Sequence, residues 1–163
     1  ACGYDNPQSI ALGSLNWAYP DALYVRTAVS EAEASGLLPA RDLGGPPNLF
    51  AFHRATTAIK LFGNKLSSPN PAAAGTTISV VLIPQALWTR ITFGPEGASV
   101  QGHVEGPDER DVVLVTEEKV VRALLDGKID APTAEKNGLV RYYGNPADIS
   151  DVRGALANAT LTN

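Results

Sequence analysis

The hydrophobic positions of the chain follow two different periods, which divide it into predicted helices and strands. Between residues 48 and 66 the apolar residues recur at helical spacing, which predicts a helix with Asn48 as its N-cap. Residues 20–36 predict an earlier helix whose narrow apolar face, from Ala22 to Ala32, consists mostly of small residues. Such a face permits close approach to another element, either within the chain or on a partner.

A two-residue period replaces the helical one in the middle of the chain. The runs 78–83, 87–93 and 98–104 alternate inward and outward residues, and the first run has apolar residues on both faces. Short turns rich in Gly and Pro join the runs, which is typical of an antiparallel meander. We expect the run 112–115 to extend this meander, and 139–143 to form a fifth strand.

Capping signals mark the helices of the C-terminal half. Each predicted helix follows a residue whose side chain can accept a hydrogen bond from the first turn, and two of the three end before a glycine. The first of these helices has two glutamates in its first turn, where the helix dipole favours negative charge. The expected N-caps are Thr116, Asp130 and Asn145, and the expected terminators are Gly127 and Gly138.

A connector rich in Pro and Gly, at residues 37–47, is the best boundary in the chain. We interpret residues 1–47 as an appendage made of an irregular arm, a helix and this connector, because so few residues cannot hold a core of their own. Residues 48–163 then form one α+β domain, and a chain of 163 residues is long enough to bury a proper core.

Composition and motifs exclude several classes of function. The net charge is −4 and there is no basic block, so a nucleic-acid partner is not expected. No apolar run approaches the ~20 residues of a transmembrane segment. The two histidines lack the spacing of metal ligands, and the chain has no G-x-S-x-G, P-loop or dinucleotide-binding turn. We therefore expect a protein that is not an enzyme and has no cofactor, metal or catalytic residue.

The start of the chain bears on its location. The sequence begins Ala1-Cys2-Gly3 and contains no methionine, so we expect an exported protein, periplasmic or secreted, whose signal peptide has been removed. The alternative is a cytoplasmic protein, or a sequence that simply starts at this residue. Cys2 is the only cysteine, which leaves a free thiol, a bond to another chain, or the remnant of a lipoprotein signal.

The segment from about Val80 to Gly144 contains, in order, a strand, a capped helix, a second short helix, a glycine and a final strand, and it includes Thr116, Glu118, Leu125, Gly127, Lys128, Gly138 and Gly144. In this order of elements and in these residues it resembles the C-terminal half of a sterol-carrier-protein-2-like (SCP2-like) lipid-binding domain. The resemblance implies a five-stranded, mainly antiparallel sheet covered on one face by helices. The N-terminal arm and first helix are additional to the family pattern.

In the family that the chain resembles, the sheet and helices enclose a tunnel for an acyl chain or sterol. The resemblance therefore implies that the chain binds or carries an apolar ligand, such as a lipid, without catalysis. The candidate cavity-lining residues lie on the inward faces of the predicted helices and strands. They are Phe52, Ile59, Phe62, Ile78, Val80, Leu82, Leu87, Ile91, Leu124, Leu125, Ile149 and Val152.

The same pattern also describes a filled core, because periodicity shows which side faces inward and not whether the interior is empty. The alternative function is a structural or accessory subunit of a larger exported assembly, which uses the same fold with a closed core. Residues 1–47 would then contact the protein partner. The arm could also cover the tunnel mouth, or fill the tunnel with Trp17.

Overall fold

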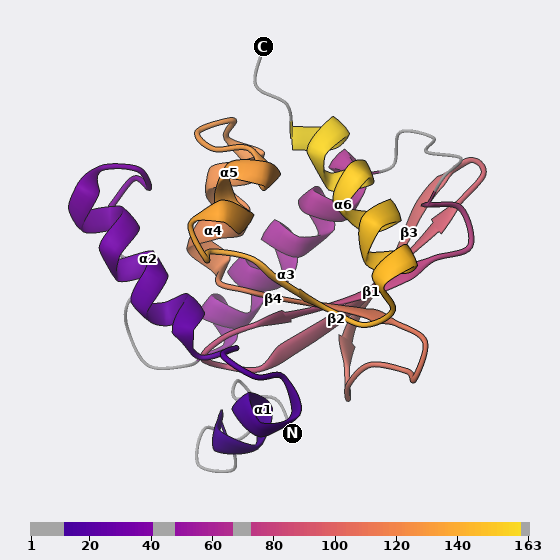
Figure 1. Ribbon diagram of the computed structural model, residues 1–163, viewed down its shortest axis with the longest axis horizontal. Coiled ribbons are helices and arrows are strands. Elements are labelled where there is room, and N and C mark those ends of the chain that lie inside the picture. Colours follow the sequence, from indigo (N-terminus) through magenta and orange to yellow (C-terminus); the bar gives the residue numbers. More distant parts are fainter. Residues whose placement is uncertain (1–11, 41–47, 67–72, 161–163) are drawn as a thin grey trace.

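The computed structural model describes residues 12–40, 48–66 and 73–160. Within these ranges the chain forms one five-stranded sheet (Figure 1). Along the sequence, helices precede the first strand, connect β4 to β5 and follow the last strand. The elements in chain order are α1 (Leu12–Ala18), α2 (Tyr24–Ser35), α3 (Leu49–Lys65), β1 (Thr77–Leu82), β2 (Leu87–Gly94), β3 (Gly97–Val104), β4 (Val112–Thr116), α4 (Glu118–Leu125), α5 (Ala131–Lys136), β5 (Arg141–Tyr143) and α6 (Pro146–Thr160).

The strand order of the sheet is β3-β2-β1-β4-β5. The neighbours pair antiparallel except β1 and β4, which are parallel, so the predicted mainly antiparallel five-stranded sheet is confirmed. The expectation that β4 extends the meander was wrong, because β4 lies on the far side of β1. β4 lies between β1 and β5, and all five of its residues, four of them apolar, are buried.

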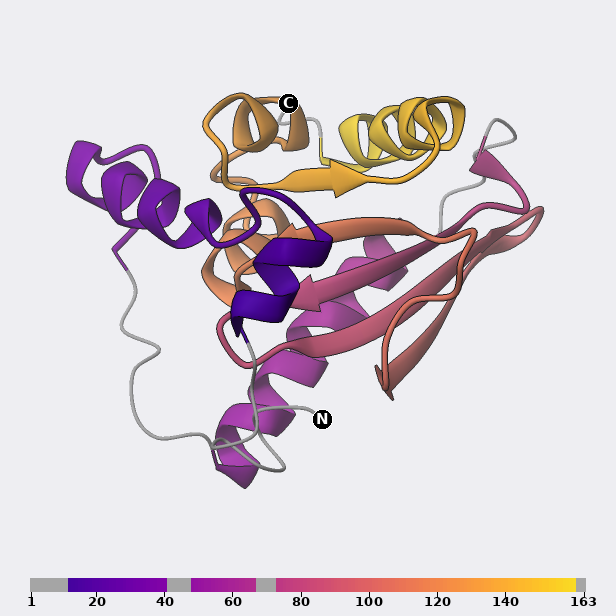
Figure 2. The ribbon, with the colours of Figure 1, turned by 60° about the horizontal axis from the view of Figure 1, so that its bottom comes forward.

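Helices cover one face of the sheet. Helix α3 runs along β3, with Gly63 beside Val100 and Ile91, while α4 packs beside α3 and α6 contacts β4 (Figure 2). This face carries the inward residues of the alternating strands. In β2, for example, Leu87 and Ile91 are buried whereas Trp88 and Arg90, on the opposite face, are partly exposed.

Three of the four predicted N-caps are confirmed; at the start of α6 the Asn145 side chain accepts a hydrogen bond from Ala147 N–H at 2.9 Å. The Asn48 side chain accepts a hydrogen bond from Ala51 N–H at 2.9 Å, and Asp130 accepts one from Thr133 N–H at 2.9 Å. Thr116 is not an N-cap, because it is the last residue of β4 and its hydroxyl donates to the Leu139 carbonyl (2.9 Å). Glu117 takes the N-cap position of α4 without a capping hydrogen bond.

The N-terminal segment is more regular than predicted. Residues 12–18 form α1 inside the stretch expected to be irregular, and α2 starts at Tyr24 rather than at Pro20. The small-residue face of α2 is buried within the chain, where Ala28 lies close to Gly138 and Glu33 pairs with Lys119 of α4. Of the two alternatives for that face, the structure shows packing within the chain.

The arm contacts the face of the sheet opposite to α3. The Tyr19 ring lies 5.3 Å from the Tyr143 ring and 6.2 Å from the Trp88 ring, measured between centroids. The Tyr143 hydroxyl donates to the Pro20 carbonyl at 2.6 Å. Trp17 is 87% exposed, so the idea that it fills a tunnel was wrong. Aromatic side chains of β2 and β5, rather than the space under α3, hold the described part of the arm.

Candidate functional site

The twelve residues predicted to line a cavity come together on the helix-covered side of the sheet and at its helices. Nine of them are at most 2% exposed and belong to one hydrophobic cluster, while Phe52, Leu125 and Ile149 are partly buried and pack against it. The predicted inward faces therefore do meet in one interior. Its side chains pack against one another, and none of the twelve lines the three surface pockets described below.

The two ends of α3 differ in how closely they approach the sheet. At the C-terminal end, a Cβ on Gly63 would overlap Val100 Cγ2, so the glycine allows close contact. At the N-terminal end, Leu49 and Phe50 are 66% and 85% exposed. Between these ends the Phe52 ring meets the His103 ring edge-on, 5.1 Å between centroids. The interior is thus closed at one end of α3 and borders exposed apolar side chains at the other.

A polar atom lies within this helix–sheet contact. The Thr56 Oγ1 atom is buried and has no hydrogen-bond partner. The Thr56 methyl group lies 4.0 Å from the position that a Cβ on Gly102 would take, so the side chain is next to β3. Buried hydroxyls normally have a partner, which makes this one a candidate contact for a polar atom of a bound molecule.

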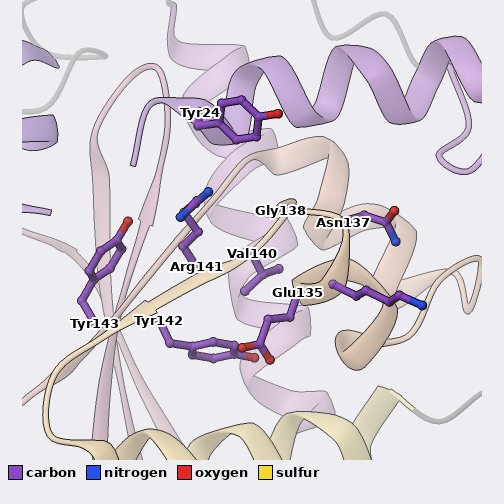
Figure 3. A pocket seen from close by; sticks show the side chains of 9 residues that line it. Tyr24, Glu135, Asn137, Gly138, Val140, Arg141, Tyr142 and Tyr143 are labelled. Atoms are coloured by element: carbon purple, nitrogen blue, oxygen red, sulfur yellow. The ribbon is translucent and has the colours of Figure 1, made fainter. Parts of the chain in front are cut away.

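A separate pocket of about 470 Å³ lies between α2, the end of α5 and β5 (Figure 3). Arg141 places its guanidinium carbon 5.6 Å from the centroid of the Tyr24 ring, within the range of a cation–π contact. Arg141 Nε and the Tyr142 hydroxyl are both buried without a hydrogen-bond partner. Burial raises the pKa of Tyr142, and the nearby Glu135 raises it further. Tyr142 therefore stays a neutral donor at ordinary pH.

Two further pockets involve described residues. One of about 660 Å³ lies between α5 and α6, beside the Glu135–Arg153 ion pair (2.7 Å). The other, of about 390 Å³, lies between α2 and α4 and includes Arg26 and Glu117. Burial raises the pKa of Glu117 to about 7, although Arg26 and Lys119 partly oppose this.

Asp111 is the centre of a group of hydrogen bonds on the face of the sheet opposite to α3. Its carboxylate accepts hydrogen bonds from the Ser79 hydroxyl at 2.7 Å, from Arg90 at 2.8 and 2.9 Å, and from Asp108 N–H at 3.1 Å. Burial alone would raise its pKa, but these hydrogen bonds hold it below its usual value. These contacts tie the segment between β3 and β4 to strands β1 and β2.

The two histidines lie against the same aromatic ring. His53 and His103 each contact the Phe52 ring, with 5.7 and 5.1 Å between ring centroids, and both are exposed. Among the residues that the structure describes, no three His, Cys, Asp or Glu side chains are arranged to hold a metal ion. Cys2 lies outside the described residues. No helix in the described ranges has the length and apolar character needed to span a bilayer.

Sequence reasoning missed the pocket beside β5. Its residues come from three elements, and Tyr24 and Arg141 are far apart in the chain. The sequence Arg141-Tyr142-Tyr143 carries no known motif, and the strand pattern assigns it only to a fifth strand. The order of elements along the chain does not show that α2 lies near β5, because this depends on how the arm crosses the sheet.

Comparison with known proteins finds no matching family model and no matching curated protein. Similar solved structures include the UbiJ-SCP2 ubiquinone synthesis protein, with a TM-score of 0.47 and 13% identity over 68% of this chain and 98% of that one. Sterol carrier protein 2 is similar with a TM-score of 0.44 and 14% identity, over 66% of this chain and 97% of its own. A stereoselective inverting sec-alkylsulfatase from Pseudomonas sp. matches 52% of this chain at 21% identity and a TM-score of 0.41, but only 14% of its own length. The predicted SCP2-like fold agrees with these likenesses, which concern the fold alone.

Proposed function

We propose that the chain binds or carries an apolar ligand, such as a lipid or acyl chain, without catalysing a reaction. The observation that supports this is the change in exposure along the side of α3 that faces the sheet. On that side Leu49 is largely exposed, Phe52 is partly buried, and Ile59 and Phe62 are fully buried in the common interior. An apolar chain that enters at the exposed end would contact these apolar side chains one after another.

The ligand would enter by moving the N-terminal half of α3 away from β3. That half lacks the close glycine contact that fixes Gly63 against Val100. Each methylene moved from water into the interior gains about 0.8 kcal/mol, so a chain of about ten methylenes gains roughly 8 kcal/mol before the cost of moving the helix. The unpaired Thr56 hydroxyl can donate to an oxygen of the entering molecule, which fixes its depth.

Uptake of a fluorescent fatty acid and of a fluorescent sterol tests this proposal. Replacement of Thr56 with Leu fills the space beside Gly102 and removes the hydroxyl, so we expect at least tenfold weaker binding. Leu61→Ala is the matched control, because Leu61 lies on the same helix but is 52% exposed. Native mass spectrometry of the protein purified from its own source adds a direct measurement. A bare chain that also takes up neither probe would refute the proposal.

A structural or accessory role is the second candidate function, and the close packing of the interior favours it. Nine of the twelve proposed lining residues are at most 2% exposed in the free chain. In this case the protein purified from its own source would elute as part of a larger complex and would carry no extractable lipid. Size-exclusion chromatography coupled to light scattering distinguishes this outcome from a monomeric carrier.

A further inference from the structure

We propose that the pocket beside β5 binds the anionic group of a small organic molecule, a carboxylate or a phosphate monoester. The pocket is separate from the interior under α3, so the inference does not depend on the carrier function. Its volume of about 470 Å³ fits a small molecule, and β5 is the edge strand of the sheet, so no further strand of that sheet covers its outer side (Figure 3).

Arg141 brings an unpaired donor to this pocket. It is one of three described residues whose side chain has a buried polar atom without a hydrogen-bond partner, and its guanidinium points toward Tyr24, whereas Tyr142 points to the opposite side of β5, toward Glu135 (Figure 3). Arg141 Nε can only donate. A group rich in acceptors, such as a carboxylate or phosphate, is therefore the chemical complement of the pocket.

The positive charge of Arg141 is not neutralised by a neighbour. Arg141 takes part in no ion pair among the residues that the structure describes, whereas the carboxylate of Glu135 is held by Arg153 at 2.7 and 2.8 Å. Burial, and to a smaller extent Asp21, raises the pKa of the Tyr143 hydroxyl, but Asp21 forms no ion pair with Arg141. Lys136 adds a second positive charge to the lining. The pocket thus has an excess of positive charge without a carboxylate free to satisfy it.

Helix α2 completes the site. Tyr24 stacks on the guanidinium, and the Tyr143 hydroxyl donates to the Pro20 carbonyl at 2.6 Å and accepts a hydrogen bond from Arg141; neither contact neutralises the positive charge. Gly138 adopts a positive φ of 73° and sits close under α2, where a Cβ would lie 3.8 Å from the Tyr24 ring. Aromatic rings therefore flank the cation, which favours an organic anion with a flat apolar part over an inorganic ion.

Titration of the ¹⁵N-labelled full chain with benzoate and with phenyl phosphate tests the inference, with benzamide as a neutral comparison. We expect the Arg141 Nε–H signal and the Gly138 amide to shift with the anions and not with benzamide. Arg141→Gln should weaken binding about tenfold, because a charge-assisted hydrogen bond is lost. Arg110→Gln removes the same charge from an exposed position and should bind as the wild type does.

Lys136→Gln separates binding from folding. Lys136 lines the pocket and is exposed, so the melting temperature should stay the same, while affinity for the anion falls about threefold. The inference is overturned if Arg141 Nε–H does not move at anion concentrations up to about 10 mM, where millimolar affinity is visible. It is equally overturned if Arg141→Gln titrates as the wild type does, or if the shifts occur at Phe52 and His103 instead.

Discussion

Replacement of Glu117 with Gln tests how one buried carboxylate sets the pH dependence of stability. Glu117 occupies the N-cap of α4, makes no capping hydrogen bond there, and lines the small polar pocket shared with α2. Burial raises its pKa from 4.5 to about 7; Arg26 and Lys119 act in the opposite direction and Glu33 adds to the rise. The charged form is therefore less favourable in the folded chain than in the unfolded chain.

The sign and size of the effect follow from this difference. Because the folded-state pKa is raised, the contribution of Glu117 to stability is fully present below pH 4.5 and is lost as the pH rises through about 7. At 1.36 kcal/mol per pH unit, the interval corresponds to at most about 3.4 kcal/mol. The side chain is partly exposed and solvent screens its charge, so we expect about 1–2 kcal/mol.

Urea denaturation at several pH values between 5 and 8 measures this contribution. We expect Glu117→Gln to be more stable than the wild type by about 1–2 kcal/mol at pH 8 and nearly equal to it at pH 5. Glu31→Gln is the control, because Glu31 is an exposed glutamate of α2. If the wild type and Glu117→Gln show the same change in unfolding free energy with pH, the reasoning from burial is refuted.

Three further substitutions test other contacts. Gly63→Ala should lower the free energy of unfolding by about 1–2 kcal/mol despite the higher helix propensity of Ala, because its Cβ overlaps Val100; in a Val100→Ala background the same change should be neutral or stabilising by thermal denaturation. Asp111→Asn should cost about 3 kcal/mol in urea denaturation, since it leaves Arg90 without its buried partner, and a loss below about 1 kcal/mol would contradict this. Asp130→Ala should cost about 1 kcal/mol by the same assay through loss of the cap on α5, and an unchanged midpoint would show that the cap is dispensable.

The sequence predicted those parts of the fold that depend on local signals. The helical spacing after Asn48 and the cap at Asp130 involve residues within one turn of each other, and both appear as expected. The alternation of residues 87–93 likewise depends only on which face of the sheet is covered. In each case the chemistry of neighbouring residues is sufficient to fix the structure.

The features that were missed depend on contacts between distant segments. The parallel pairing of β1 with β4 cannot be read from two apolar runs, because such runs fit either direction. Thr116 has the chemistry of an N-cap, but its hydroxyl is used by the Leu139 carbonyl, which only the folded chain brings near. The pocket at Arg141 escaped for the same reason, since Tyr24 reaches it only after α2 has docked.

The contact of Tyr19 with Trp88 and Tyr143 has a practical consequence for any shortened version of the protein. A fragment that starts at residue 48 would keep every strand, yet it would uncover these aromatic rings on the open face of the sheet. It would also uncover the surface on which α2 rests beside Gly138. Exposed apolar surface of this kind promotes self-association. We therefore expect a fragment that lacks residues 1–47 to self-associate more readily than the full chain.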